Sequence, residues 1–288
     1  MSRIAVITGT THGIGMVTSR ELAKAGCTVV MLCRNEKAAA KVRADLLAGV
    51  PGADVHAIHC DLASLASVRE CAQAVRSRFE RIDLLINNAG IVSMQQRLSE
   101  DGFELTFATN HLGPFLLTRL LLDRLTARGR IVTVASRNHY KGRLGAPDLA
   151  QVAGRRARYN AGAAYARSKL ANVMHTLALA RRLEGTGITA NCLHPGVVDT
   201  HLLPRWLRLL RPLRSRDIID AEQGARTTLY LALSDEVAGV SGRYFDERQA
   251  VQPPLEAAND VTLQEALWQA SERWVGGPAS RVAEPAPR

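Results

Sequence analysis

Ile4-Ala5-Val6-Ile7-Thr8-Gly9-Thr10-Thr11-His12-Gly13-Ile14-Gly15 is the stretch of this sequence that decides the fold. Its apolar, β-branched start predicts a buried strand, and its glycines permit a tight turn into a helix. Such a turn lets the backbone approach a pyrophosphate closely while the helix N-terminus faces the anion. A glycine-rich turn alone also suits an ordinary strand–helix connection, so its meaning depends on what repeats along the chain.

Strand-like and helix-like segments alternate along the rest of the chain. Short apolar runs predict strands at Ile4–Thr8, Thr28–Cys33, Val55–Cys60, Ile82–Asn87, Arg130–Ala135 and Ile188–His194. Longer amphipathic segments predict helices at Gly15–Ala25, Glu36–Leu47, Ser64–Phe79, Phe103–Ala127 and Ala161–Glu184, then a helix at Ala221–Ser234 and a strand at Gly242–Phe245. Such alternation requires a parallel sheet covered on both faces. We therefore predict an α/β protein, a doubly wound Rossmann fold of about seven parallel strands.

The chain shows no internal repeat and no linker that would divide it. Its 288 residues, 47% of them hydrophobic, suffice for one large core. We predict one domain over residues 1–275 and a disordered tail, rich in Pro, Ala and Gly, over 276–288. No run approaches the roughly 18 apolar residues that span a bilayer, and strand-like Arg3–Thr8 leaves no room for a signal peptide. We expect a cytoplasmic protein.

Composition argues against three other classes of function. The net charge is +10, but the arginines are spread along the chain and form no single patch, so we predict no nucleic-acid partner. The five cysteines are scattered and lack the spacing of a zinc site or a disulfide framework. His56 and His59 fall on opposite faces of one strand, and no ligand triad is evident, so we predict no metal.

The end of the second predicted strand bears on the choice of nucleotide. A carboxylate there favours the ribose hydroxyls of NAD, whereas a cation favours the 2′-phosphate of NADP. The strand ends without an acid, and Arg34-Asn35 follows it directly, so we predict NADP(H). Glu36 keeps NAD(H) open, although its charge also suits the first turn of the next helix. After the third strand, Asp61-Leu62 places a carboxylate that can accept from the adenine amino group or cap a helix.

Tyr165-Ala166-Arg167-Ser168-Lys169 puts a phenol and an ammonium one helical turn apart on the same face. Only five of the 37 basic residues are lysines, so a lysine here stands out. Lysine is a compact charge whose proton affinity can be tuned, whereas arginine stays protonated. We therefore interpret Tyr165 and Lys169 as an acid–base pair. A nearby ammonium is expected to lower the pKa of the phenol from its usual value of about 10.

Together these residues resemble the short-chain dehydrogenase/reductase family over nearly the whole chain. The motifs that carry the resemblance occur in family order: the glycine turn, Asp61-Leu62, Asn87-Asn88-Ala89-Gly90, Asn110, Ser136, Tyr165-x3-Lys169 and His194-Pro195-Gly196-Val197-Val198-Asp199-Thr200. Further stretches look like its retinol-dehydrogenase branch: Thr109-Asn110-His111-Leu112-Gly113, Tyr159-Asn160-Ala161-Gly162, Ser168-Lys169-Leu170-Ala171-Asn172 and Ser241-Gly242-Arg243-Tyr244-Phe245. Two features depart from that branch: no N-terminal membrane anchor is seen, and Ala135 replaces a usual serine, so retinoid specificity does not carry over.

The resemblance implies a catalytic set of Asn110, Ser136, Tyr165 and Lys169. Tyr165 would be the general acid in carbonyl reduction and the base in alcohol oxidation. Lys169 would hold the nicotinamide ribose, and Ser136 would donate to the substrate oxygen. Asn110 would hold a water that passes protons to Lys169, although it also suits a helix kink.

The resemblance also implies cofactor contacts at the glycine turn and at several strand ends. The predicted contact residues are Gly9, Thr11, His12, Gly13, Ile14, Gly15, Arg34, Asn35, Asp61, Leu62, Asn88, Ala89, Gly90, Tyr165, Lys169, Pro195, Gly196, Val198 and Thr200. These sites follow the carboxyl ends of strands, where ligands gather in doubly wound sheets.

The segment Thr200–Arg216 combines leucines and Trp206 with several arginines. Directly after the nicotinamide loop, it would act as a lid that covers an apolar substrate. Its basic and apolar faces also suit transient membrane contact through residues 201–213. In either case we expect a small hydrophobic alcohol or carbonyl compound as the substrate.

We therefore predict an NADP(H)-dependent oxidoreductase that moves a hydride between the nicotinamide and such a substrate. The alternative is a non-catalytic, dinucleotide-sensing protein that binds partners, but a sensor needs no proton relay. Many members of the family form oligomers through the helices equivalent to Phe103–Ala127 and Ala161–Glu184. The resemblance therefore implies that a homo-oligomer is possible.

Overall fold

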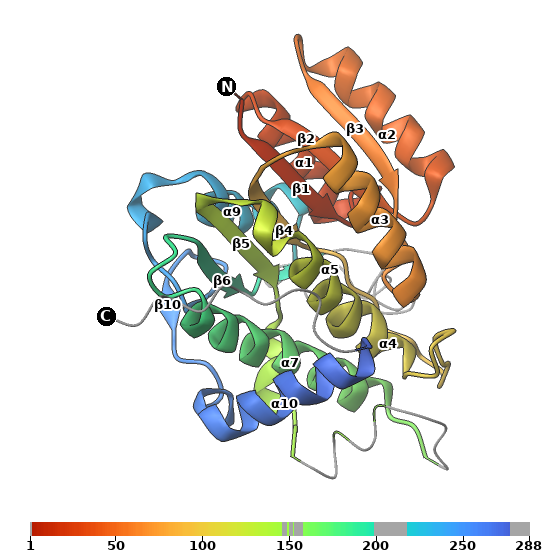
Figure 1. Cartoon of the computed structure of the whole chain (residues 1–288), viewed down its shortest axis with the longest axis vertical. Helices are drawn as coiled ribbons and strands as arrows, with labels where there is room; N and C mark the ends of the chain where they lie inside the picture. Colours follow the sequence, from red (N-terminus) through yellow and green to blue (C-terminus); the bar gives the residue numbers. More distant parts are fainter. Residues whose placement is uncertain (1, 146–148, 150–151, 153–157, 199–217, 277–288) are drawn as a thin grey trace.

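The computed structural model of the chain describes residues 2–145, 149, 152, 158–198 and 218–276. Within them, eight strands form one sheet in the order β10-β9-β6-β5-β4-β1-β2-β3 (Figure 1). In chain order the strands are β1 Ile4–Thr8, β2 Thr28–Cys33, β3 Asp54–His59, β4 Ile82–Asn87, β5 Leu125–Val134, β6 Thr189–Leu193, β9 Tyr244–Phe245 and β10 Val251–Gln252. Neighbours pair in parallel except β10, which runs antiparallel to β9. The predicted Rossmann sheet is confirmed, with a short antiparallel strand added at one edge.

Helices cover both faces of this sheet. They are α1 Gly13–Lys24, α2 Glu36–Gly49, α3 Leu65–Arg78, α4 Leu105–Phe107, α5 Gly113–Leu121, α7 Ala161–Arg182, α9 Ala221–Leu233 and α10 Val261–Trp274. Residues of α1, α2 and α9 share one buried cluster with β2, including Leu22, Val42 and Leu231. Residues of α3, α5 and α7 form the larger cluster on the other face. The two clusters follow from strands that are buried on both sides, as a parallel sheet requires.

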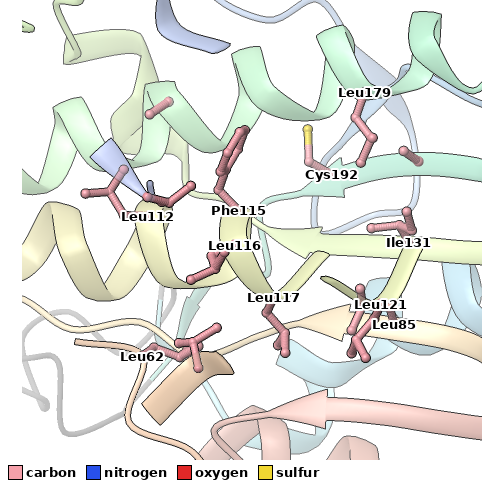
Figure 2. Packing of buried hydrophobic residues seen from close by; sticks show 14 of the residues in the cluster. Leu62, Leu85, Leu112, Phe115, Leu116, Leu117, Leu121, Ile131, Leu179 and Cys192 are labelled. Carbon is pink, nitrogen blue, oxygen red and sulfur yellow. The ribbon is translucent and has the colours of Figure 1, made fainter. Parts of the chain in front are cut away.

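Helix α5 packs beside α3 on the face of the sheet that α7 also covers. In Figure 2, Phe115 points toward α7, whereas Leu117 and Leu121 lie on the side of Leu85 from β4. Phe115 and Leu117 are fully buried. Burying a side chain of this size contributes roughly 2 kcal/mol, so this layer is a main source of stability.

The helix predicted at Phe103–Ala127 is wrong in its extent and its form. Helix α4 begins at Leu105, a π-helical turn (η1) covers Ala108–Leu112, and α5 ends at Leu121, followed by a 3-10 turn at Leu122–Arg124. Strand β5 then begins at Leu125, five residues before the predicted start. The sequence shows no break between the end of the helix and the start of the strand, because apolar residues continue across both. The strand is longer than predicted because its register on β4 shifts between Ile82 and Leu84, which adds residues to β5.

The C-terminal helix α10 was not predicted, and it packs along α7 (Figure 1). Its Trp268 lies under the guanidinium of Arg182, 3.9 Å from ring centroid to carbon. Glu272 pairs with Arg119 of α5, and Glu265 pairs with Arg182. The helix therefore covers faces of α5 and α7 that the sequence suggested for self-association. None of the helices in the described part of the chain is both long enough and apolar enough to span a bilayer.

Candidate active site

The glycine turn between β1 and α1 is closed so tightly that no side chain fits at Gly9 or Gly15. Gly9 and Gly13 have positive φ values, +72° and +57°. A Cβ on Gly15 would lie 2.2 Å from the Gly9 carbonyl oxygen and 2.5 Å from Nδ2 of Asn88. The turn therefore presents backbone at the start of α1, which is the arrangement that a phosphate group needs.

The end of β4 is fastened to this turn by hydrogen bonds. The hydroxyl of Thr8 accepts from the backbone N–H groups of Asn88 and Ala89, both at 3.0 Å. The amide of Asn88 donates to the Thr8 carbonyl at 2.8 Å. A Cβ on Gly9 would come within 2.9 Å of Ala89. Asn88 and Ala89, predicted as cofactor contacts, thus also hold two strand ends in register.

Arg34 lies exposed just beyond β2, and the residues around it have structural partners. The side chain of Asn35 caps α2 by accepting from Ala38 N–H at 3.0 Å. Asp61 accepts from Ala63 N–H at 3.0 Å, but the residue that caps α3 is Ser64. The helix-cap interpretation of Asp61 is therefore wrong.

Leu62 is buried and faces the core. A Cβ on Gly113 would lie 2.9 Å from the Leu62 Cβ and 2.3 Å from its carbonyl oxygen. Any contact of Leu62 with a nucleotide must therefore involve its backbone, because its side chain belongs to the packing between β3 and α5.

Ser136 and Tyr165 come together from β5 and α7. Burial raises the pKa of the Tyr165 phenol, and a hydrogen bond with Ser136 opposes that rise. The Ser136 hydroxyl also accepts from Asn138 N–H at 3.2 Å. The Lys169 ammonium lies 5.7 Å from the phenol ring centroid.

Lys169 is a buried ammonium at the carboxyl end of β5. Its Nζ donates to the Val134 carbonyl at 2.7 Å, and only 3% of the residue is exposed. Burial lowers its pKa from 10.5 to about 8. It remains mostly protonated at neutral pH, so it places a positive charge beside Tyr165 within a nearly dry region.

Asn110 lies in the π-helical turn and ties three segments together. Its Oδ1 accepts from Ile91 N–H at 2.8 Å, and its Nδ2 donates to the Ile91 carbonyl and to the Ser168 hydroxyl, both at 3.0 Å. Both amide hydrogens are therefore used, which fixes the loop after β4 against α7. The kink interpretation is close to the geometry, since a π turn interrupts the helix here and such turns are frequent at functional sites.

Gly90 marks the point where these groups converge. A Cβ on Gly90 would lie 3.4 Å from Lys169 Nζ and 3.5 Å from Asn110 Oδ1. The backbone after β4 thus passes directly over the ammonium and the amide. Together with Ser136 and Tyr165, the four predicted catalytic side chains occupy one place at the carboxyl edge of β4, β5 and β6.

The segment after β6 begins in the described structure and continues outside it. Pro195 is buried, and Gly196 has a φ of +92°, so a larger residue there would be strained. Val198 is buried in a two-residue strand, β7 Val197–Val198, which pairs in parallel with β8 Ile218–Ile219. Thr200 and the predicted lid 200–216 lie outside the described residues, as does the tail over 277–288.

Three residues that support this site were not predicted to do so. Ser168 receives the hydrogen bond from Asn110, and the sequence signal for it was its place beside Lys169. His139 Nε2 accepts from Leu255 N–H, so its Nδ1 carries a proton and donates to the Ser136 carbonyl at 2.8 Å. Glu104, a buried carboxylate, caps α4 with both oxygens. Because the predicted helix begins at Phe103, no sequence signal indicates this role of Glu104.

Comparisons with known proteins agree with this geometry. A family model described as short chain dehydrogenase matches residues 3–147 and 149–208. Human retinol dehydrogenase 13 is 40% identical over 297 residues, which cover 99% of this chain and 88% of that protein. A crystal structure of a putative uncharacterized protein from Mycobacterium paratuberculosis is 36% identical with a TM-score of 0.79, covering 97% of this chain and 95% of that one. A short chain dehydrogenase from Burkholderia cenocepacia, solved in complex with NADP, is 27% identical with a TM-score of 0.69, covering 85% and 95%.

Proposed function

The chain belongs to the short-chain dehydrogenase family, and from that premise we propose that it is an NADP(H)-dependent oxidoreductase acting on a hydrophobic alcohol or carbonyl compound. The observation that carries the proposal is the convergence at Gly90, where Lys169 and Asn110 approach the same strand end that Ser136 and Tyr165 flank. A dinucleotide sensor without catalysis has no use for a buried ammonium next to a phenol.

Tyr165 acts as the proton donor in carbonyl reduction in this proposal. Because burial raises its pKa, the phenol is protonated at neutral pH and can donate to the carbonyl oxygen as negative charge develops there. Ser136 is the second donor to that oxygen, and its hydrogen bond with Tyr165 holds both hydroxyl groups together. In alcohol oxidation the same residue would act as the base and accept the proton.

Lys169 stabilises the phenolate that remains after the proton is given up. Its ammonium donates a hydrogen bond to the Val134 carbonyl, and this bond fixes the end of an otherwise flexible side chain. Asn110 keeps the Gly90–Ile91 backbone beside this ammonium, and that backbone limits the space in which a cofactor can lie.

In this proposal the turn between β1 and α1 is the cradle that holds the nucleotide, chiefly through its backbone groups. The bound nicotinamide supplies or accepts the hydride. The exclusion of a Cβ at Gly15 and the positive φ values of Gly9 and Gly13 suit a pyrophosphate at the start of α1. Arg34 is exposed beyond β2, where a guanidinium can clamp a 2′-phosphate, and no carboxylate ends that strand. A related chain solved with NADP supports the same choice.

The proposal includes the further cofactor contacts predicted at Asp61, Pro195, Gly196, Val198 and Thr200. It also includes a location in the cytoplasm. The hydrophobic substrate class is supported by the relatives, which include proteins called retinol dehydrogenases. The lid and transient membrane contact through residues 201–213 belong to the same proposal and rest on the sequence alone.

The test is a turnover assay with purified protein. Oxidation of NADPH is followed with aromatic, retinoid-like and steroid carbonyl compounds, and NADH is compared at equal concentration. We expect turnover with NADPH and a loss of about 10²–10⁴-fold in kcat for Tyr165→Phe, with nucleotide binding retained. Undiminished turnover in that variant would remove Tyr165 from the mechanism. A preference for NADH would remove the role given to Arg34, and nucleotide binding without any turnover would favour the sensor.

A further inference from the structure

The short segment Ile91–Ser93, just after Gly90, is held on both of its backbone edges by side chains. Asn110 pairs with the N–H and the carbonyl of Ile91. Two residues later, Ser93 N–H donates to the Thr106 hydroxyl at 3.2 Å, and the Ser93 carbonyl accepts from the Tyr159 hydroxyl at 3.0 Å. The segment is thus attached like a strand, but its partners are side chains from α4, η1 and the residues before α7.

Tyr159 and Glu104 form the outer attachment of this segment. The Tyr159 hydroxyl lies 3.0 Å from Glu104 Oε1 as well as from the Ser93 carbonyl, so one proton is shared between two acceptors. Burial and the Glu104 carboxylate raise the pKa of Tyr159 to about 12, which keeps this hydroxyl a donor over the whole neutral range. The two residues are 55 positions apart in the chain.

Glu104 also fixes the helix that carries Asn110. Its Oε1 accepts from Thr106 N–H at 2.8 Å and its Oε2 from Phe107 N–H at 2.9 Å. Its own N–H donates to the Val152 carbonyl at 2.8 Å. The carboxylate is only 4% exposed, so these bonds are made in a region of low dielectric, where each is strong and its loss is costly. One carboxylate therefore orders the start of α4 and receives Tyr159.

The segment offers an apolar surface next to the catalytic groups. Gly90, which precedes the segment, passes over Lys169, and Ile91 and Val92 of the segment are partly exposed. Met94, one residue beyond Ser93, is 66% exposed. An apolar wall that begins at the catalytic ammonium and ends in a flexible methionine suits a hydrophobic substrate.

We propose that Tyr159 and Glu104 are positioning residues that set the substrate-side wall of the site by clamping Ile91–Ser93, and thereby determine the affinity for bulky hydrophobic carbonyl compounds. This role rests on the proposed function. Neither residue touches the reacting atoms. The clamp acts on the wall, whereas the proton chemistry belongs to Tyr165.

The decisive variant is Tyr159→Phe, and the chain offers a matched control. Tyr230→Phe on α9 removes another hydroxyl that bonds a glutamate at 3.0 Å, here the exposed Glu236 just after that helix. For Tyr159→Phe we expect the KM of a bulky aromatic aldehyde to rise about tenfold while kcat changes less than about threefold. The KM of a three-carbon aldehyde and that of NADPH should stay within about twofold, as should every constant of Tyr230→Phe. A change shared equally by large and small aldehydes would mean a general structural role and overturn the proposal.

Glu104→Gln tests whether the two residues act as one unit. A glutamine offers one acceptor where the carboxylate offers two, so either Phe107 or the Tyr159 side loses its partner. We expect the same selective rise in KM, and in the double variant a rise no larger than about that of the stronger single variant. Rises that multiply would show independent effects and contradict a clamp.

Hydrogen exchange separates a failure of the clamp from a failure of the proposed function. In Tyr159→Phe, the amides of Ile91 and Ser93 should exchange about tenfold faster, and those of β1 should not change. If wild-type protein reduces no carbonyl compound, the proposed function fails, while this readout still decides whether the clamp exists. If exchange of the segment matches Tyr230→Phe, the clamp is wrong even in an active enzyme.

Discussion

The parts of the chain before and after residue 100 bury different kinds of polar side chain. In the described residues before 100, the buried polar side chains are small hydroxyl groups and Asn87. After residue 100, buried titratable side chains gather: Glu104, His111, His139, Lys169, His175 and His194. In the proposed function, the part before residue 100 presents backbone to a ligand that brings its own charge, and the part after it holds protons and charges in place. The difference teaches that a phosphate site needs side chains to be absent, whereas a proton-transfer site needs them to be buried.

Acid pH should have the largest effect, and it should destabilise the part after residue 100 more than the part before it. Burial lowers the pKa of His111 from 6.5 to about 3 and that of His175 well below its ordinary value. Their lowered values mean that the folded state binds fewer protons, so the stabilisation is complete above pH 6.5 and is lost as the pH falls. At pH 4 the loss from His111 alone is about 3 kcal/mol. Hydrogen exchange between pH 7 and pH 4 should show α7 and α10 opening before β1–β3.

A matched pair of variants isolates the buried histidine. His175 packs 5.1 Å from the Phe115 ring and 5.5 Å from the Trp268 ring, so His175→Phe keeps an aromatic contact and removes the titration. Its acid unfolding midpoint should fall by about half a pH unit or more, whereas exposed His59→Phe should leave the midpoint unchanged. Opening of β1–β3 first, or equal midpoints in both variants, would contradict the assignment.

Gly15→Ala tests the half that is built from backbone. The new Cβ would lie 2.2 Å from the Gly9 carbonyl oxygen, so the turn must shift. We expect a loss of about 1–3 kcal/mol in unfolding free energy and of at least about tenfold in NADPH affinity, measured by denaturant unfolding and fluorescence titration. Gly49→Ala at the end of α2 is the control, because no atom lies within 4 Å of the added Cβ. If both variants bind NADPH like the wild type, the cradle has been placed wrongly.

Lys169→Met should change the stability with the opposite sign. Because burial lowers the pKa of Lys169 to about 8, the charged form is disfavoured in the folded state. Removing the charge should stabilise the protein by about 1–3 kcal/mol at pH 7 and abolish turnover. In the wild type, the stability from this group should rise between pH 8 and the ordinary pKa of 10.5. Destabilisation by Lys169→Met at pH 7 would show that the bond to Val134 outweighs the buried charge.

Local patterns determined the elements and the ingredients of the site. The alternation of strands and helices is written in side-chain periodicity, which depends only on neighbours in the chain, and so the Rossmann sheet could be predicted. The one-turn spacing of Tyr165 and Lys169 is local in the same sense, as is the need for glycine in the turn after β1. The family resemblance could likewise be stated from motif order alone.

Only the tertiary structure decided how these parts bear on one another. It brought Ser136 to Tyr165, where their hydrogen bond opposes the rise in the pKa of the phenol, and it committed the Asn110 amide to Ile91 and Ser168. It started β5 at Leu125 through a shift in register, and it set α10 against α7. Each of these depends on burial and on contacts between residues far apart in the chain, and neither quantity is encoded in the spacing of nearby residues.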